Sequence, residues 1–391
     1  MISLLLASML ILSAGPGPPC YVAFAPEGTT TEGSGYTALV AGSSGQVYLG
    51  SARYGGYGFL LELEPRAREI RKLADLRDIT GEDQHGIFTQ AKIHSKMSIA
   101  SDGKVYFASK QGHEVFDTRP EYEDAAGYPG GHLCVHDPAT GQTRDLGIPV
   151  RGEGLLWAIL DEPRGRVYLK SEPRNRFLYY NLATGTVADR GNLGAACRYL
   201  ALGADGVAYT IGRGGVLCRF DPQRDVVEDI EVAVEGEGGY QSPYVIALAP
   251  DGRRLYGLVG GHPYVMEFDV ERAAKTVAVR NAARAIGGDL PNKDIHAAVF
   301  GKDGQLYYPV LTSGDEVHLM RFDPVARRAT DLGVPAPQGL NDEAHRHLYV
   351  RGDRYRLDSI QGAAVGPDGT LYLMDIYPQL SVAIFPALTA R

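Results

Sequence analysis

A short phrase recurs along this chain of 391 residues: a tight turn, usually Asp-Gly, followed by a short strand that ends in tyrosine. The turn suits a hairpin, because glycine tolerates a positive φ and aspartate hydrogen-bonds its own backbone. The copies end at Tyr48, Tyr106, Tyr168, Tyr209, Tyr256, Tyr307 and Tyr372. About seven copies at a spacing of roughly 40–65 residues predict a propeller or a comparable repeat array.

The second copy displays the whole repeating unit. Residues 92–100 read as an inner strand, 105–108 as a second strand, 131–136 as a third and 142–146 as an outer strand. Helical periodicity is nearly absent from the chain. The pattern therefore predicts an all-β fold, a seven-bladed β-propeller of four-stranded antiparallel blades, because radial closure leaves few exposed edges. An open stack of repeats is the alternative, and it would leave one edge bare.

The last repeat ends without a fourth strand. An early apolar run, Tyr21 to Phe24, has the character of the missing strand and predicts that the ring is closed between the two chain ends. We expect residues 20–391 to form a single propeller domain.

The first residues, Met1 to Ala14, are almost wholly apolar, and a proline-rich segment follows them. This run is shorter than a membrane span and is typical of a signal-peptide core. We therefore interpret residues 1–19 as a signal peptide and expect a secreted or periplasmic protein without a transmembrane segment. A misassigned start or a simple apolar tail is the alternative.

Charge and cysteine content narrow the classes of partner. The net charge of -8 argues against nucleic acid and anionic membranes, so an anionic substrate would need a local basic cluster. The spacing of the four cysteines matches no zinc or redox motif, and Cys134 and Cys218 read as buried thiols. The sequence leaves a disulfide open, requires no cofactor, leaves metal content open and suggests a monomer.

The repeat sorts polar residues onto one face of the ring. Entries into the inner strands and the loops between second and third strands open onto the same face, where propeller sites usually lie. The inner-strand entries carry Tyr36, His94, Trp157, Arg198, Tyr244 and His296. The loops carry Arg53, Tyr54, His113, Arg174, Arg176, Arg213, His262, Asp375 and Tyr377. A lone histidine at a strand start is more often a satisfied hydrogen-bond partner, so the functional reading depends on convergence of these side chains.

Segments 90–95, 101–107, 112–113 and 128–133 resemble the corresponding parts of seven-bladed propeller polysaccharide lyases. These are the ulvan lyases and the L-rhamnose-α-1,4-D-glucuronate lyases, with related rhamnosidases on the same scaffold. The resemblance implies two catalytic histidines, matched by His94 and His113, and a carboxylate-binding arginine, matched by Arg174 with Arg176 close behind. The family tyrosine has no counterpart, because its stretch contains Trp157 and no tyrosine.

These residues suit β-elimination from a uronate, in which the proton on C5 is removed and the oxygen on C4 leaves. We expect Arg174 to neutralise the carboxylate, and His94 and His113 to share the base and acid roles, since the pKa of histidine lies near neutrality. The remaining rim residues are expected to bind substrate, Trp157 and Tyr244 by stacking on sugar rings. They are Arg176, Trp157, Arg198, Tyr244, His262 and His296.

The sequence thus predicts a polysaccharide lyase, a carbon–oxygen lyase that acts on an anionic polysaccharide or oligosaccharide. A glycoside hydrolase on the same scaffold is an alternative, which usually needs two positioned carboxylates. The rim offers Glu114, Glu172 and Asp375 for that task. A non-catalytic propeller that binds sugar or protein is the third reading, because the fold alone does not decide function.

Overall fold

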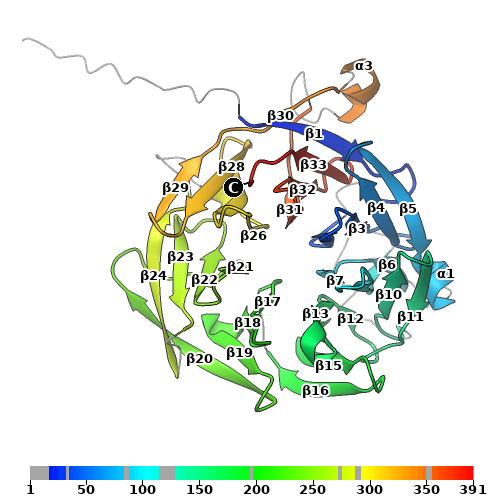
Figure 1. Ribbon diagram of the computed structural model, residues 1–391, viewed down its shortest axis with the longest axis horizontal. Coiled ribbons are helices and arrows are strands. Elements are labelled where there is room, and N and C mark those ends of the chain that lie inside the picture. Colours follow the sequence, from blue (N-terminus) through cyan, green and yellow to red (C-terminus); the bar gives the residue numbers. More distant parts are fainter. Residues whose placement is uncertain are drawn as a thin grey trace, which may run out of the picture.

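Radially arranged sheets form a ring around a central opening (Figure 1). The computed structural model describes residues 17–31, 35–82, 88–113, 128–193, 197–271, 275–286, 292–340, 342–348 and 355–390. The all-β prediction is confirmed, because helix within these residues is limited to short pieces. They are α1 (Leu76–Thr80), α3 (Asp342–His345) and the 3-10 turns Glu162–Arg164, Arg213–Gly215 and Arg346–Leu348.

The first half of the ring consists of antiparallel meanders, each ordered from the centre outward. The first contains β2 (Leu39–Ala41), β3 (Val47–Gly50), β4 (Phe59–Glu64) and β5 (Glu69–Asp75). The next contains β7 (Ser98–Ile99), β8 (Val105–Ala108), β10 (Leu133–Asp137) and β11 (Gln142–Asp145). It is followed by β12 (Gly154–Leu155) and β13 (Ile159–Asp161), which both pair with β14 (Arg166–Glu172), and then β15 (Arg176–Asn181) and β16 (Val187–Asn192).

The second half of the ring repeats the same order. One meander contains β17 (Ala201–Leu202), β18 (Ala208–Ile211), β19 (Leu217–Asp221) and β20 (Val226–Glu235). Another contains β21 (Val245–Leu248), β22 (Arg254–Leu258), β23 (Tyr264–Asp269) and β24 (Thr276–Arg284). A third contains β25 (Asn292–Asp294) and β26 (Val299–Phe300), both paired with β27 (Leu306–Thr312), then β28 (Val317–Asp323) and β29 (Arg328–Asp331).

The sheet that closes the ring contains both ends of the chain. Its strands are β31 (Ile360–Val365), β32 (Leu371–Asp375), β33 (Ser381–Phe385), β1 (Pro19–Phe24) and β30 (Ala336–Pro337). Strand β1 runs antiparallel to β33, with Tyr21 opposite Ile384 and Phe24 opposite Ser381. This is the pairing that the apolar run Tyr21 to Phe24 predicts. The proposed signal segment lies mostly outside the described residues, which begin at Gly17.

The repeated turns have the expected geometry. The glycines of the seven copies all have a positive φ, between 59° at Gly165 and 93° at Gly45. In the second copy the Asp102 carboxylate accepts the backbone N–H of Lys104 at 3.1 Å, and Asp303 accepts that of Gln305 at 3.0 Å. The prediction of tight turns is therefore confirmed.

The core lies between neighbouring sheets. Tyr168 and Tyr307 are almost fully buried, which agrees with the packing role predicted for the repeated tyrosines. Tyr168 packs against Phe177 and Phe220 from the adjacent strands and sheet, with ring centroids 5.6 Å and 5.3 Å away. All four cysteines are buried free thiols, so no disulfide joins them.

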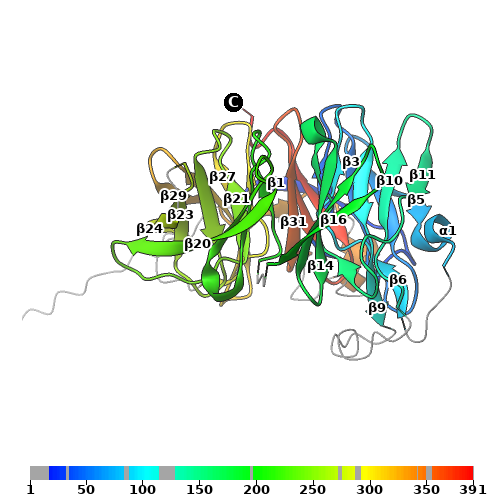
Figure 2. The same ribbon diagram turned by 90° about the horizontal axis from the view of Figure 1, so that it is seen from below.

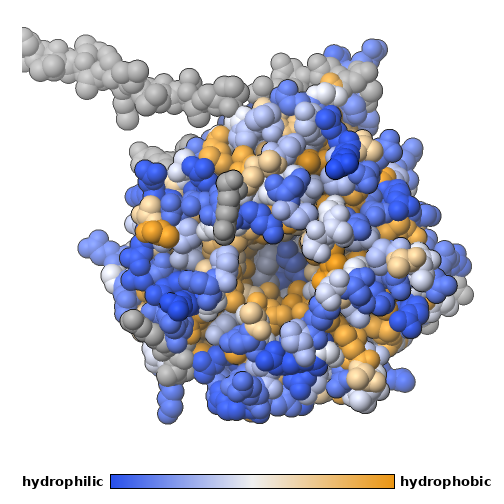
Figure 3. All heavy atoms as spheres, viewed as in Figure 1, coloured by the Kyte–Doolittle hydropathy of each residue, from blue (hydrophilic) through white to orange (hydrophobic). Residues whose placement is uncertain are grey.

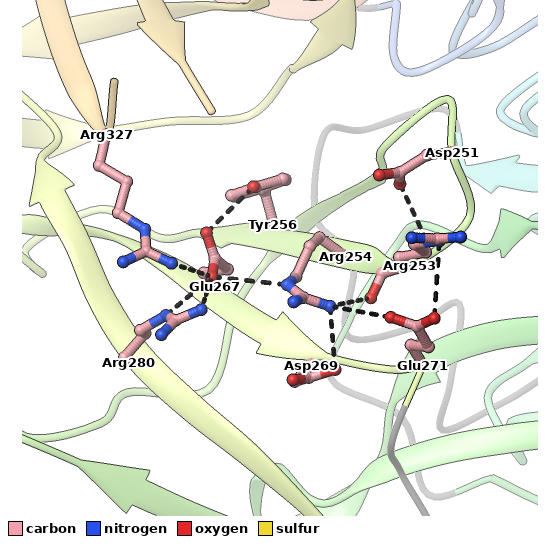
Figure 4. Close-up of polar contacts among 9 residues, drawn as sticks. All are labelled: Asp251, Arg253, Arg254, Tyr256, Glu267, Asp269, Glu271, Arg280 and Arg327. Carbon is pink, nitrogen blue, oxygen red and sulfur yellow. Dashed lines mark hydrogen bonds and ion pairs between the residues drawn. The ribbon is translucent and has the colours of Figure 1, made fainter. Parts of the chain in front are cut away.

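Two adjacent sheets are joined at their outer strands. Strand β20 continues past β19 and pairs in parallel with β24, from Glu231 opposite Thr276 to Glu235 opposite Arg280. Next to this junction, Arg254, Arg280 and Arg327 converge on the buried carboxylate of Glu267 (Figure 4). Arg327 comes from the turn before β29, so the cluster ties a third sheet to this pair.

The two faces of the ring differ in what they present. In the side view of Figure 2, β6 (Phe88–Lys92) and β9 (Lys110–His113) lie on one face of the ring and the C-terminus lies on the other. Strands β6 and β9 form a separate two-stranded sheet. Figure 3 shows that the ring is hollowed at its centre on the face turned toward the viewer. In the described part of the chain, no helix has the length and apolar character needed to cross a membrane.

Candidate functional site at the channel mouth

Side chains from five inner-strand entries form a continuous chain of ring–ring and cation–ring contacts. The rings of Tyr36 and His94 lie 4.0 Å apart between centroids. The Arg198 guanidinium lies 5.9 Å from the Tyr36 ring and 5.4 Å from the Tyr244 ring. Tyr244 in turn meets the edge of His296 at 5.0 Å. We call Tyr36, His94, Arg198, Tyr244 and His296 the mouth cluster. The structure thus brings together four of the residues predicted for the site, together with Tyr36.

His94 is the most deeply enclosed member of the mouth cluster. It is 3% exposed, and its Nδ1 atom has no hydrogen-bond partner among the described residues. Its carbonyl accepts the Thr37 hydroxyl at 3.0 Å, which fixes the strand entry. Burial, and after it the charges of Arg198, Lys110 and Lys92, hold the pKa of His94 well below its usual range. The imidazole is therefore neutral at neutral pH and has an unused nitrogen.

Buried lysines surround the mouth cluster with positive charge. Lys92 ends β6, Lys110 begins β9 and Lys170 lies on β14, and each side chain is almost wholly enclosed. The Lys92 ammonium lies 4.5 Å from the ring of Tyr54, and Lys170 donates to the carbonyl of Cys197 at 3.1 Å. This basic centre stands against the net charge of -8 for the whole chain. It is the local basic cluster that an anionic ligand would require.

One carboxylate lies among these cations. Glu172, at the end of β14, is 2.7 Å from the Lys110 ammonium. Burial alone would raise the pKa of Glu172, but Lys110, Arg198 and Lys170 outweigh burial and hold that pKa at about 2. Glu172 is therefore ionised at neutral pH, and its ion pair orients Lys110 beneath the mouth.

A second layer of side chains crosses the channel beneath the mouth cluster. The Tyr199 hydroxyl donates to the carbonyls of His296 and of Gln361, the latter at 3.3 Å. The Lys96 ammonium lies 5.1 Å from the Tyr199 ring, and burial lowers the pKa of Lys96 to about 8. Because Tyr199 and Lys96 lie one and two residues deeper along their strands than Arg198 and His94, they form the floor of the mouth.

His296 has a carboxylate partner that His94 lacks. Its Nε2 is paired with the Asp294 carboxylate, while its Nδ1 is buried and has no hydrogen-bond partner in the described part of the chain. A small cavity of about 20 Å³ adjoins this pair. Asp294, His296, Asp358 and Ser359 supply its polar lining, and Pro309, Leu311, Val317 and Ile360 supply the apolar part.

Three predicted site residues are engaged elsewhere. Arg174 is 65% exposed, and its Nε lies 3.1 Å from the fully buried carboxylate of Glu153. Arg176 is paired with Asp189 on the outer strand of the same sheet. His262 is buried, and its Nε2 lies 3.3 Å from the Asn281 side-chain oxygen. The cations that act on His94 are Arg198, Lys110 and Lys92 instead. A substrate role for Arg174, Arg176 and His262 stays a prediction.

The expectation that Trp157 stacks on a sugar ring needs correction. Its side chain is fully buried in the core with Tyr168 and Phe177, so neither face of the indole is open to a ligand. Its Nε1 donates to the Arg198 carbonyl at 2.9 Å, which holds the backbone beneath the mouth cluster. His113 ends β9 opposite Phe88, but its side chain lies outside the described residues. The catalytic role of His113 therefore stays a prediction.

The sequence did contain a signal for the residues that were missed. Lys92, Lys110 and Lys170 each lie at a strand position with an uncharged residue on either side. Lysine is almost never fully buried unless it is paired or functional. A charged residue in such a strand thus points to a polar interior, although the sequence does not say which strands lie at the mouth. In the described ranges, no three His, Cys, Asp or Glu side chains are grouped to hold a metal ion.

Comparisons with known proteins identify the fold. No family model matches the sequence, and no curated protein matches it. Among solved structures, the chain is similar to the WD40 repeats of RRP9, with a TM-score of 0.60 and 15% identity over 95% of this chain and 98% of that one. It is similar to U3-55K with a TM-score of 0.59 and 15% identity, over 95% of this chain and 100% of that one.

A third similar structure is an extracellular domain assigned to a one-component system of B. thetaiotaomicron, with a TM-score of 0.58 and 10% identity. The match covers 94% of this chain and 40% of that chain, so the chain spans less than half the length of that protein. At such identities the likeness shows the fold alone. The chain has the fold of a β-propeller, as its repeat predicts, and the resemblance to polysaccharide lyases stays a prediction.

Proposed function

We propose that the protein binds a uronate-containing glycan at the mouth cluster and cleaves it by β-elimination. The observation that carries the proposal is His94, a buried neutral imidazole with an unused Nδ1, packed on Tyr36 in the field of Arg198 and Lys110. Elimination next to a carboxylate requires a neutral imidazole in the site to take the proton and a cation to stabilise the developing charge, and the mouth cluster offers both. We propose that the scaffold is a seven-bladed propeller, in which the eight-stranded sheet is two blades divided at the β20–β24 junction and the two-stranded β6–β9 sheet lies outside the blades.

The reaction distributes charge as follows. The substrate carboxylate lies against Arg198, which stabilises the negative charge that develops when C5 loses its proton. An imidazole of the mouth cluster takes that proton, a C4–C5 double bond forms, and the bond from C4 to the glycosidic oxygen breaks. The leaving oxygen takes a proton from a hydroxyl of the cluster such as Tyr36. In this scheme Arg198 performs the role that the sequence assigned to Arg174.

The carboxylates near the mouth favour elimination over hydrolysis. Glu172 is committed to Lys110, and Asp294 is paired with His296. Asp375 is fully buried and accepts the backbone N–H groups of Asp358 and Ser359 at 3.0 Å and 2.8 Å. Hydrolysis of a glycoside usually requires one carboxylic acid and one carboxylate free to face the bond. These three carboxyl groups have structural partners instead.

The proposal is tested by incubation with ulvan, gum arabic side chains and other uronate glycans, with ultraviolet absorbance of the unsaturated product as the measurement. We expect absorbance to grow with the wild type and to vanish in His94→Ala and Arg198→Ala. Arg174→Ala separates the two candidate arginines, and Arg224→Ala is a control, because Arg224 pairs with Asp221 and Glu228 at an exposed turn.

Other outcomes distinguish the alternatives. New reducing ends without absorbance would indicate a glycoside hydrolase. Saturable binding of the glycan without either product would indicate a non-catalytic binding propeller. Failure of every glycan to bind or react would overturn the proposal.

We also propose that the chain is exported, with residues 1–19 removed. The support is the apolar run before Gly15. Expression of the full chain in a bacterial host, followed by sequencing of the N-terminus in the periplasmic fraction, tests the proposal. An uncleaved protein confined to the cytoplasm would overturn it.

A further inference from the structure

Asp294 holds His296 in one orientation. Asp294 ends β25, which pairs with β27, so its backbone is part of the sheet. One carboxylate oxygen accepts the backbone N–H of Ile295 at 3.0 Å. The other oxygen, Oδ2, is in contact with the His296 Nε2. The carboxylate is therefore fixed from the backbone side and directs its free oxygen at the imidazole.

This pairing determines which ring nitrogen carries the proton. An ionised carboxylate accepts hydrogen bonds only, so Nε2 must be the N–H donor. In the neutral imidazole, Nδ1 then has a lone pair and no proton. That Nδ1 atom is buried and has no hydrogen-bond partner among the described residues. A buried polar atom without a partner costs about 1–3 kcal/mol, and a natural protein retains it for a reason.

The ring of His296 belongs to the mouth cluster. It meets the Tyr244 ring edge to face, and the Arg198 guanidinium lies 5.4 Å from the Tyr244 ring. His94 is at the opposite end of the cluster, beyond Tyr36. A ligand carboxylate on Arg198 would thus lie between two imidazoles, each with an unused Nδ1.

The two imidazoles differ in their charged neighbours. Arg198, Lys110 and Lys92 would each repel a positive charge on His94. His296 has the Asp294 carboxylate beside it, and an imidazolium at this position would form an ion pair. Carboxylates that orient a histidine and stabilise its imidazolium recur in catalytic sites on unrelated folds.

We propose that His296, oriented by Asp294, presents an unprotonated Nδ1 to the uronate and takes the proton from C5, with Asp294 as the positioning residue. The inference rests on the proposed function and names the base within it. The electron pair of the C5–H bond forms the C4–C5 double bond, and the leaving oxygen on C4 departs with a proton from a hydroxyl of the mouth cluster. His94 then borders the sugar on the far side of Arg198.

The first test does not need activity. Long-range nitrogen–proton NMR spectra identify the tautomer of each histidine ring, and the His296→Gln variant assigns the His296 signals. We expect the Nε2–H tautomer in the wild type, loss of that preference in Asp294→Asn, and a shift of the Nδ1 signal when glucuronate is added. An Nδ1–H tautomer, or saturation with glucuronate that leaves the Nδ1 signal unmoved, would overturn the inference.

The second test uses turnover of the glycan that the wild type cleaves. We expect Asp294→Asn to lower kcat by roughly 10²–10⁴-fold, the range of general-base catalysis, with KM changed by less than about 3-fold. Asp294→Glu should restore part of kcat, which a merely structural role would not predict. His136→Gln is the matched control, because His136 pairs with Thr143 between β10 and β11, outside the mouth cluster. Its kcat should stay near that of the wild type.

The two proposals fail in different ways. Wild-type activity with kcat unchanged in both His296→Gln and Asp294→Asn would overturn the assignment of the base and leave the lyase intact. An inactive wild type would overturn the lyase, and the NMR tautomer and its response to glucuronate would still decide whether His296 presents Nδ1 to the ligand. Circular dichroism and thermal unfolding of each variant separate loss of chemistry from loss of folding.

Discussion

The Glu172 carboxylate lies 2.7 Å from the Lys110 ammonium and so joins β14 to β9 beneath the channel mouth. Lys110 is almost fully buried, and Glu172 is the acidic side chain in contact with it. Glu172 neutralises the buried charge of Lys110 and fixes the position of its ammonium. Lys110 is one of the cations that lower the pKa of His94. Stability and electrostatics of the mouth are thus coupled through two residues.

Glu172→Gln should destabilise the protein by ~1–3 kcal/mol at neutral pH, because it removes a carboxylate that is paired with a buried ammonium. The pKa of Glu172 is lowered to about 2 in the folded state, so its contribution is complete above the ordinary glutamate pKa and is lost as pH falls toward about 2. Urea unfolding across this range should show the gap between wild type and variant closing. Glu271→Gln, at an exposed pair with Arg253, is the control. A pH-independent gap would contradict the prediction.

Arg198→Ala should weaken binding of a glucuronate oligosaccharide by about 10–100-fold, because a charge-assisted hydrogen bond to a carboxylate contributes about 1.5–3 kcal/mol. Arg198 lies over two tyrosine rings and is only partly buried, so its removal should cost little folding stability. Titration calorimetry measures the affinity. Arg198→Lys should recover part of it, and Arg224→Ala should bind as the wild type does. Equal affinity of Arg198→Ala and wild type would exclude Arg198 as the carboxylate site.

For Asp375 we expect stability to change with pH in the opposite direction to that expected for Glu172. Burial outweighs the hydrogen bonds from the backbone of Asp358, Ser359 and Tyr377, and it raises the pKa of Asp375 to about 7. The folded state therefore binds more protons than the unfolded state between about pH 4 and about pH 7, and stability from this group falls as pH rises.

The cost of Asp375→Asn should accordingly be smaller at about pH 8 than at about pH 5, by about 2–3 kcal/mol. Urea unfolding of both proteins at the two pH values measures the difference. The same cost at both values would show that Asp375 is already ionised at the lower pH.

Substitution of Glu267 would measure how strongly its ion pairs hold neighbouring sheets together near the outer strands. Arg280 donates to its carboxylate at 2.7 Å, Arg327 at 3.3 Å, and the Tyr256 hydroxyl binds the other oxygen at 3.1 Å (Figure 4). Because Glu267 is buried, Glu267→Gln should cost about 3 kcal/mol or more in unfolding free energy. Arg253→Gln, whose side chain is 64% exposed, should cost at most about 1 kcal/mol. Similar losses for the two variants would contradict the prediction.

The sequence predicted what depends on local backbone chemistry. The Asp-Gly turns require positive φ, and their regular recurrence sets the strand register, so the inner-strand entries could be placed at one mouth. That reasoning placed His94, Arg198, Tyr244 and His296 at one mouth, where they form the mouth cluster, because each lies just before its inner strand. The pairing of β1 with β33 followed from a missing strand and one unclaimed apolar run.

What depends on side-chain direction was not predictable in this way. Trp157 occupies an entry position like its neighbours, but its indole enters the core, since Tyr168 and Phe177 leave an apolar space there. Arg174 meets Glu153, a residue whose full burial no pattern in the sequence reveals. Lys92 and Lys110 come from the extra pair β6 and β9, which lies outside the repeat.

The pairing of β1 with β33 has a consequence for the order in which the protein is made. Strand β1 finds its partner, residues 381–385, only after all the described sheets between them have been synthesised. Until then β1 has an unpaired edge, a template for contacts with other chains. Contacts distant in sequence form slowly, so the ring must stay open while most of it is already present. The unpaired edge of β1 is therefore exposed to wrong partners throughout that time.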